Sequence, residues 1–368
     1  MDRKSIQELH FPEGLPKLWC PLISHYTREG EFDPLRSAAH ISHLKPYVNA
    51  FLIPGSTGDG WEMGPPERLE LIDMLQSTIE RINGKLLVGV LETARGAAVR
   101  EIKNIILRCD MSGKGAVCGV VVTAPRGENL SQDTIYNELS SVLELGVPTA
   151  LYQLPQITEN EVAPETAARL ADSYPNLYLL KDTSGFDRIA EAAVMPEDLF
   201  MVRGAEGDYL RWYRAAGGPY DGFLLSTANG FAPQLSRIIR LADEAAEGSG
   251  TAEDSSTARG SSTVRGSSTA EDGGPDGGKA ARKEAEDVSR LLSKIVAESF
   301  KLCADLPFGN PFANSNKVVD HWMAYGRMAL KRPMPMTHSG NILPSLLVER
   351  IGDMVKGAGL MPEKGYLE

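Results

Sequence analysis

Residues 147–185 read VPTALYQLPQITENEVAPETAARLADSYPNLYLLKDTSG and contain the unit that recurs along the chain. A short apolar run, Pro148–Tyr152, precedes an amphipathic stretch, Pro164–Ser173, and a second apolar run, Leu177–Lys181, follows. Runs this short and apolar on both faces are typical of parallel strands that helices cover. Pro164 suits the first turn of a helix, where the N–H that proline lacks would have no partner. The stretch therefore predicts a strand–helix–strand unit.

The same alternation extends to both sides of this unit. The other predicted strands are Leu18–Ile23, Ala50–Ile53, Lys85–Val90, Gly119–Thr123, Phe200–Arg203 and Gly222–Ser226. The predicted helices between them are Pro34–Leu44, Pro66–Ile82, Ala97–Met111, Gln132–Leu145, Gly207–Ala216 and Pro233–Ala246. Eight strands favour an α/β fold of the TIM (β/α)8 barrel type, because a doubly wound sheet usually has fewer. A doubly wound sheet stays the alternative, although no Gly-x-Gly-x-x-Gly follows the first strand.

The chain divides into three predicted parts. Residues 1–247 form the barrel, and residues 248–279 form a flexible insertion that contains the repeat SSTARG-SSTVRG-SSTAED. This insertion has almost no apolar side chains to bury, so it cannot offset the entropy lost on ordering. Residues 280–368 are predicted to form a C-terminal helical extension packed on the barrel, with helices at Ala280–Asp305, Lys317–Met328 and Leu343–Val355.

Composition excludes several classes of partner. The net charge is −11, from 38 Lys and Arg against 49 Asp and Glu, so a nucleic-acid partner is not expected. No run of about 18 apolar residues predicts a membrane span. The charged N-terminus lacks the apolar core of a signal peptide. The four cysteines form no C-x-x-C pair, which is typical of reduced thiols in a cytoplasmic protein.

Lys181 lies at the end of the sixth predicted strand, and barrel enzymes place their active sites at this end of the strands. Alternation predicts that Lys181 shares the inward face with Leu177 and Leu179. A poorly hydrated barrel interior disfavours the ammonium form, and the neutral amine can attack a ketone to form an imine. The alternative is a lysine that extends from the strand end into solvent.

Other strands also end in polar residues. Tyr152 ends the fifth strand, where its phenol either shuttles protons or is a buried structural group. The second strand leads into PGSTGDG (54–60), in which glycines, Ser56 and Thr57 can form an anion-binding turn for a carboxylate or phosphate. A plain tight turn is the alternative, and no P-loop lysine follows. Glu206 and Ser226 follow the seventh and eighth strands.

The chain resembles the dihydrodipicolinate synthase / N-acetylneuraminate lyase family of pyruvate-type aldolases. The resemblance runs from Leu18 to Ile351, interrupted by the insertion. It rests on GSTGDG (55–60), LYQLP (151–155), LLKDTSG (179–185), GGPYDGFLLSTANGFAP (217–233), NPFANSNKVVDHWM (310–323) and RPMPMTHSG (332–340).

This resemblance implies a role for each matched residue. Lys181 would form the imine with a 2-oxo acid, Tyr152 would move protons, and Ser56 would belong to that relay. Ser56 and Thr57 would also hold the carboxylate of the substrate. The distal part of the substrate would meet Thr183, Glu206 and Ser226. The resemblance also implies a homo-oligomer, either a dimer or a tetramer, and neither a cofactor nor a metal is expected.

The sequence also departs from the family. Residues 123–128 lack the tyrosine pair of the dihydrodipicolinate synthases, Ile157 stands where they carry an arginine, and Ser24-His25 replaces their Thr-Pro. These differences argue against a role in lysine biosynthesis. We hypothesise that Arg126 or His25 replaces part of the missing relay or distal anchor. The choice of substrate is expected to depend on Arg126, Gln153, Ile157 and Glu206.

The sequence therefore predicts a Schiff-base-forming lyase, an aldolase or a dehydratase, that acts on pyruvate or a related 2-oxo acid. A 2-keto-3-deoxy sugar acid is one candidate substrate. A non-catalytic 2-oxo-acid-binding or regulatory protein on the same fold is the alternative. A metal-dependent aldolase is a third option, but His40 and His43 lie in a predicted helix away from the strand ends.

Overall fold

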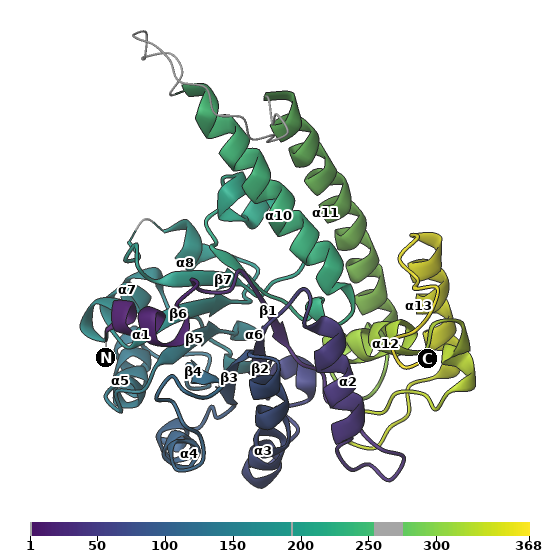
Figure 1. Cartoon of the computed structure of the whole chain (residues 1–368). Helices are drawn as coiled ribbons and strands as arrows, with labels where there is room; N and C mark the ends of the chain where they lie inside the picture. Colours follow the sequence, from purple (N-terminus) through teal and green to yellow (C-terminus); the bar gives the residue numbers. More distant parts are fainter. Residues whose placement is uncertain (1, 193, 254–274) are drawn as a thin grey trace.

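The computed structural model describes residues 2–192, 194–253 and 275–368, and its eight parallel strands close into a barrel in the order β1 to β8 (Figure 1). The strands are β1 (Leu18–Pro21), β2 (Ala50–Ile53), β3 (Lys85–Val90), β4 (Val117–Thr123), β5 (Thr149–Gln153), β6 (Leu177–Asp182), β7 (Phe200–Arg203) and β8 (Gly222–Leu224). The predicted barrel is confirmed, and β2, β3 and β7 have the predicted bounds.

Helices surround the strands. They are α2 (Pro34–Leu44), α3 (Pro65–Arg81), α4 (Ala97–Ile106), α5 (Gln132–Leu143), α7 (Pro164–Ser173), α9 (Tyr209–Trp212) with η2 (Arg214–Ala216), and α10 (Ala228–Glu253). The side chains of Asp33 and Ser131 cap α2 and α5 by accepting hydrogen bonds from backbone N–H groups of the first turn. Three further helices were not predicted: α1 (Arg3–His10), α6 (Pro155–Thr158) and α8 (Arg188–Glu191).

The barrel interior is filled with side chains from the strands, among them Leu52, Val121 and Leu179. Helix α1 closes the end of the barrel where the strands begin, since its Arg3 donates to the carbonyl of Leu177, the first residue of β6. A second apolar layer lies between the strands and the surrounding helices. The barrel interior is therefore a packed core rather than a pore.

A bulge in β6 changes the predicted alternation. Leu177 pairs with Thr149 and Leu179 pairs with Ala150, so Tyr178 is an extra residue in β6. The prediction that Leu177 faces the interior is therefore wrong, and Leu177 packs in the outer layer. Leu179 lies in the inner cluster, as predicted.

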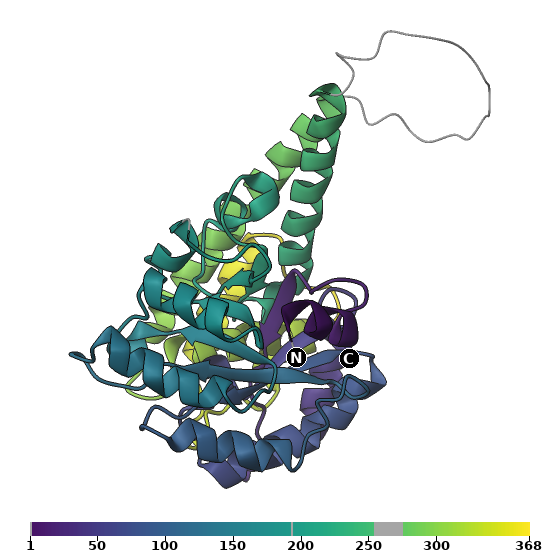
Figure 2. The same cartoon turned by 90° about the vertical axis from the view of Figure 1, so that its left-hand side faces the viewer.

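The C-terminal part contains α11 (Pro275–Ala304), α12 (Pro311–Tyr325), η4 (Gly326–Lys331) and α13 (Ser345–Gly357). Helices α10 and α11 lie side by side and project from the barrel (Figures 1 and 2). They include both ends of the predicted insertion 248–279, and residues 254–274 lie outside the described residues. The division into three parts otherwise stays a prediction.

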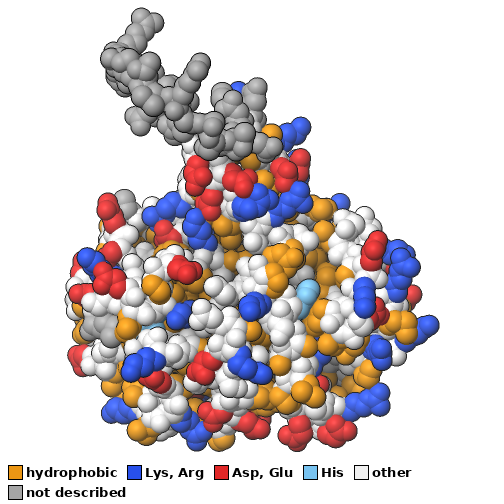
Figure 3. Space-filling model, viewed as in Figure 1, with side chains coloured by type: hydrophobic (Ala, Val, Ile, Leu, Met, Phe, Trp, Pro, Cys, Tyr) orange, Lys and Arg blue, Asp and Glu red, His pale blue; other side chains and the backbone are white. Residues whose placement is uncertain are grey.

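The surface shows no single-sign charge stripe among the described residues on the face drawn in Figure 3, where acidic and basic side chains are interspersed. None of the described helices is long and apolar enough to cross a membrane.

Candidate active site

The C-terminal ends of the strands surround a cavity of about 410 Å³. The residues to which the family resemblance gave a role in catalysis or substrate binding line it: Ser56, Thr57, Tyr152, Lys181, Thr183, Glu206 and Ser226. The structure thus brings together residues from β2, β5, β6, β7 and β8 or from the loops that follow them. Their chemical roles stay predictions.

Lys181 is buried at the base of this cavity, with 4% of its surface exposed. Its neighbour across the β5–β6 pair is Tyr152, and the Lys181 Nζ lies 4.0 Å from the centre of the tyrosine ring. Among the described residues, no carboxylate lies within ion-pair distance of this amine. A desolvated lysine of this kind is suited to nucleophilic attack on a carbonyl.

Gly204, directly after β7, leaves room for the lysine chain. A Cβ at this position would lie 2.7 Å from the Lys181 Cε and 2.1 Å from the Thr183 Oγ1. No larger residue fits unless both of these side chains move. This requirement could not be predicted from the sequence, in which Gly204 is only a glycine at a strand end.

The anion-binding turn contains the short helix η1 (Ser56–Gly58). The Ser56 Oγ lies 3.5 Å from the Tyr152 hydroxyl and accepts a hydrogen bond of 2.8 Å from the Trp61 indole N–H. Because Trp61 supplies one donor to Ser56, the hydroxyl hydrogen of Ser56 is free to point toward Tyr152. Trp61 was not predicted to take part in the site.

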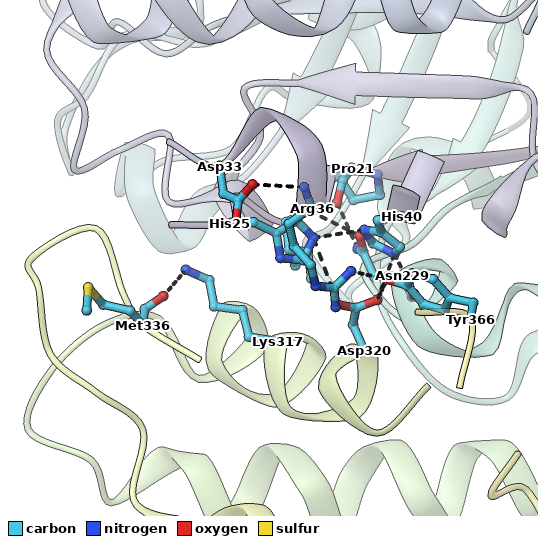
Figure 4. Close-up of polar contacts among 11 residues, drawn as sticks. Pro21, His25, Asp33, Arg36, His40, Asn229, Lys317, Asp320, Met336 and Tyr366 are labelled. Carbon is cyan, nitrogen blue, oxygen red and sulfur yellow. Dashed lines mark hydrogen bonds and ion pairs between the residues drawn. The ribbon is translucent and has the colours of Figure 1, made fainter. Parts of the chain in front are cut away.

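Contacts outside the cavity hold this turn in place. The Ser24 Oγ donates to the Gly58 carbonyl at 2.7 Å, and the Tyr26 hydroxyl donates to Asp59 at 3.1 Å. Asp59 also forms a fully buried ion pair with Lys317 of α12. Lys317 in turn donates to the Met336 carbonyl at 2.9 Å (Figure 4). The C-terminal extension therefore supports the turn that is expected to bind the carboxylate.

Glu206 and Ser226 are bonded to each other. Glu206 Oε1 accepts from the Ser226 hydroxyl at 2.7 Å and from the Thr227 N–H at 3.0 Å, while Oε2 accepts from the Tyr209 hydroxyl at 3.0 Å. This network fixes the only carboxylate among the described residues that line the cavity.

Of the other residues expected to influence substrate choice, Ile157 lines the cavity. Gln153 is buried and exchanges two hydrogen bonds of 3.1 Å with the backbone of Val162, so it stabilises the loop after β5. Arg126 pairs with Glu159 at the surface. Neither Arg126 nor His25 lines the cavity, and the hypothesis that one of them replaces the missing anchor finds no support.

His25 belongs to a separate buried cluster between α2 and α12 (Figure 4). Its Nε2 lies 3.3 Å from the His40 Nδ1, and the His40 Nε2 lies 2.9 Å from the Asn229 carbonyl. Asp320 pairs with Arg36 and accepts from the Tyr366 hydroxyl at 2.7 Å. Burial raises the pKa of Asp320, but Arg36 and the two histidines outweigh burial and lower it below its ordinary value.

Side-chain atoms of His25, His40 and Asp320 lie within 4.8 Å of one another, a spacing that metal ligands can have. The guanidinium of Arg36, however, already neutralises this carboxylate. The cluster also lies outside the cavity that contains Lys181. We therefore assign it the structural role of joining α12 to α2.

A sequence model of the Dihydrodipicolinate synthetase family matches residues 15–254, which is more than half of the chain. The chain belongs to this family. The similar curated members include the 4-hydroxy-tetrahydrodipicolinate synthases of Bacillus velezensis (27% identical) and Bacillus subtilis (26% identical). Each match covers 50% of this chain, and the chain spans 63% and 62% of these relatives, less than two thirds of their length.

Solved structures of the family have the same fold. The dihydrodipicolinate synthase of Aquifex aeolicus superposes with a TM-score of 0.66 at 17% identity, over 95% of this chain and 100% of the other. The Escherichia coli K12 prophage protein YagE, in complex with pyruvate, superposes with a TM-score of 0.64 at 19% identity, over 93% of this chain and 98% of the other. A Sulfolobus solfataricus 2-keto-3-deoxygluconate aldolase variant superposes with a TM-score of 0.62 at 17% identity, over 94% of this chain and 96% of the other.

Proposed function

We propose that this chain is a Schiff-base-forming lyase, an aldolase or a dehydratase, that acts on pyruvate or a related 2-oxo acid. The observation that carries the proposal is the buried amine of Lys181, 4.0 Å from the Tyr152 ring, in one cavity with the Ser56–Thr57 turn. Membership of the family supports it. So do the ligands of two similar structures, which are pyruvate and L-2-keto-3-deoxy-galactonate.

The first step is imine formation. The backbone N–H groups and hydroxyls of the Ser56–Thr57 turn bind the carboxylate of the 2-oxo acid and orient its C2 carbonyl toward Lys181. The neutral amine attacks C2, and Tyr152 donates a proton to the hydroxyl that leaves as water. The product is a protonated imine between Lys181 and C2.

The iminium then accepts an electron pair from the substrate. In an aldol cleavage, the C3–C4 bond breaks, the C4 hydroxyl loses its proton to Tyr152, and the bonding pair forms an enamine. In a dehydration, Tyr152 takes the proton of C3 to give the enamine and returns it to the C4 hydroxyl, which leaves as water; water then releases the unsaturated 2-oxo acid from the resulting imine. Protonation of the enamine and addition of water release the 2-oxo acid and restore the amine.

Ser56 is a positioning residue in this scheme. Its Oγ lies 3.5 Å from the Tyr152 hydroxyl, and the Trp61 donor fixes its orientation. A phenol held by a serine hydroxyl can give and take back a proton without moving. This arrangement suits a residue that acts as acid in one step and as base in another.

Borohydride reduction in the presence of pyruvate tests the imine. We expect mass spectrometry to find the reduced adduct on the peptide that contains Lys181, and to find none in the Lys181→Arg variant. Tyr152→Phe should form the adduct at least ~100-fold more slowly, a typical loss for a general acid–base group. If pyruvate binds without an adduct and Lys181→Ala binds it equally well, the chain is a 2-oxo-acid binder instead.

The expected homo-oligomer and the cytoplasmic location stay predictions. Light scattering on the purified chain measures the first, and a fluorescent fusion locates the second.

A further inference from the structure

The half of the cavity away from Lys181 is apolar. Ile157 follows β5, while Val296, Ala297 and Phe300 lie on one face of α11. The Phe312 ring of α12 packs edge-on against Phe300, with 4.6 Å between the ring centres. Two helices of the C-terminal extension thus form an apolar roof over the mouth of the barrel.

Polar side chains on the same wall are already bonded to the protein. Gln156 donates to the Thr183 carbonyl at 3.1 Å, Ser293 donates to the Ser289 carbonyl at 2.7 Å, and the Asn310 side chain accepts from the Phe312 N–H at 2.9 Å. Each of these polar groups is held by a hydrogen bond to the backbone, whereas the apolar side chains that make up the rest of the wall offer substrate hydroxyls no partner.

The charged residues that line the cavity offer no partner to a second carboxylate on the substrate. Lys181 and Glu206 are the only charged residues among the described residues that line the cavity. Once Lys181 carries the substrate as an imine, no lysine or arginine remains to pair with a second carboxylate. Glu206 would repel such a group, because its own charge is held in the cavity.

We propose, on the basis of the imine function above, that the group beyond C4 of the substrate is uncharged and apolar. The substrate class is then a 4-hydroxy-2-oxo acid that carries an alkyl or aryl group at C4. Burial of that group against Ile157, Phe300 and their neighbours favours binding, because apolar surface is removed from water. A cavity of about 410 Å³ lies in the range that holds small organic ligands.

The reaction balances without a further reactant. Cleavage of R–CHOH–CH2–CO–COO⁻ breaks the C3–C4 bond and gives the aldehyde R–CHO and pyruvate. The proton of the C4 hydroxyl leaves through Tyr152, and C3 gains a proton when the enamine returns to the imine. Condensation of pyruvate with the aldehyde is the same sequence in reverse, which makes the aldehyde a convenient probe.

Two aldehydes of equal shape test the inference. 4-Methylpentanal and succinic semialdehyde differ in that an isopropyl group replaces a carboxylate, and glyceraldehyde adds a hydroxylated probe. Each is incubated with the enzyme and pyruvate, and the condensation product is quantified. We expect kcat/KM for 4-methylpentanal to exceed both other values by at least ~10-fold, the discrimination that a small apolar contact provides.

Two matched variants test whether the preference for 4-methylpentanal depends on the apolar side chains of the cavity wall. Ile157→Asn replaces the aliphatic side chain with an amide of the same number of non-hydrogen atoms and should lower kcat/KM for 4-methylpentanal by ~10-fold. Leu291→Asn is the control, because Leu291 lies on α11, is 40% exposed and does not line the cavity. The kcat/KM of Leu291→Asn should equal that of the unmodified chain for every aldehyde.

Borohydride trapping with pyruvate accompanies every assay. If the adduct forms on Lys181 but succinic semialdehyde or glyceraldehyde reacts as well as 4-methylpentanal, the apolar substrate class is wrong and the proposed function stands. An adduct without condensation of any aldehyde also overturns the inference. If no 2-oxo acid forms an adduct, the proposed function fails and this inference fails with it.

Discussion

Lys181 owes its position to residues that leave it space. It extends from a strand end above Leu179 and Ala150 in the barrel interior, and Gly204 keeps the neighbouring strand end free of a side chain. The lysine itself was recognisable in the sequence, because a single polar residue ended an apolar run. Gly204 was not, because its importance arises from a contact across the β6–β7 pair.

Replacement of Gly204 by alanine should slow imine formation. The new Cβ would lie 2.7 Å from the Lys181 Cε and 2.1 Å from the Thr183 Oγ1, so both side chains must move. A displacement near 1 Å commonly costs about 100-fold in rate, and we expect a loss of ~10- to 100-fold in borohydride trapping with pyruvate.

Gly64→Ala is the control for this prediction. Its Cβ would meet no atom closer than 3.4 Å, which is an ordinary contact. A trapping rate in Gly204→Ala equal to that of the control would show that the amine does not depend on this space.

Helix α12 connects the turn after β2 to the rest of the molecule. Lys317 pairs with Asp59 behind the Ser56–Thr57 turn, and Asp320, one turn later, pairs with Arg36 of α2. The two pairs bury their charges almost completely. A buried pair contributes little net stability, but the loss of one partner leaves a charge without compensation.

Substitution of Lys317 by methionine should therefore destabilise the chain strongly. We expect a loss of about 3–5 kcal/mol in the free energy of unfolding by urea, because Asp59 would stay buried without its cation. The double variant Lys317→Met/Asp59→Asn removes the stranded charge and should recover part of the loss. Lys294→Met, at an exposed position of α11, should change stability by less than about 0.5 kcal/mol. An equal loss in the single and double variants would contradict the argument.

Sequence reasoning succeeded where the signal was local. Strands β2, β3 and β7 were predicted with their observed bounds, because each is a short apolar run between polar turns. Helices α6 and α8 have four residues each, too few to show a helical period, and they were missed. The bulge at Tyr178 was invisible, since it depends on pairing with β5.

One part of the candidate site could be predicted from the sequence, and another part could not. Its polar half follows from residues at strand ends, which barrel topology brings together. The part that α11 contributes was missed because Val296 and Phe300 repeat at the spacing of any helix that faces a core. The Asp59–Lys317 pair joins positions separated by 258 residues, and nothing local indicates it.

The whole molecule should lose stability as the pH falls. Burial lowers the pKa values of His25, His40 and His321 below 6.5, so at a given pH these histidines hold fewer protons in the folded chain than in the unfolded chain. Unfolding lets them take up protons at a pH where the folded chain does not. The contribution of these histidines to the free energy of unfolding is fully present above about pH 6.5 and declines as the pH falls.

Urea unfolding at pH 8, 6 and 5 measures this dependence. We expect the free energy of unfolding to decrease below about pH 6.5, by up to about 1.4 kcal/mol per pH unit for each histidine that stays neutral. The lowered pKa of Asp320 adds a further decrease below about pH 4, where the unfolded carboxylate takes up its proton first. His25→Asn should flatten the slope between pH 6.5 and 5. Higher stability at pH 5 than at pH 8 would refute the prediction.

The roof that α11 and α12 place over the barrel has an evolutionary consequence. The groups proposed to break and make bonds come from residues 56–226, whereas much of the surface proposed to meet the remainder of the substrate comes from residues 296–312. Mutations in residues 296–312 can therefore change which substrate a descendant enzyme accepts, while the type of reaction stays the same. For protein engineering, positions 296, 297 and 300 form a small set that can be varied together to select new aldehyde substrates while Lys181 and the strand ends stay unchanged.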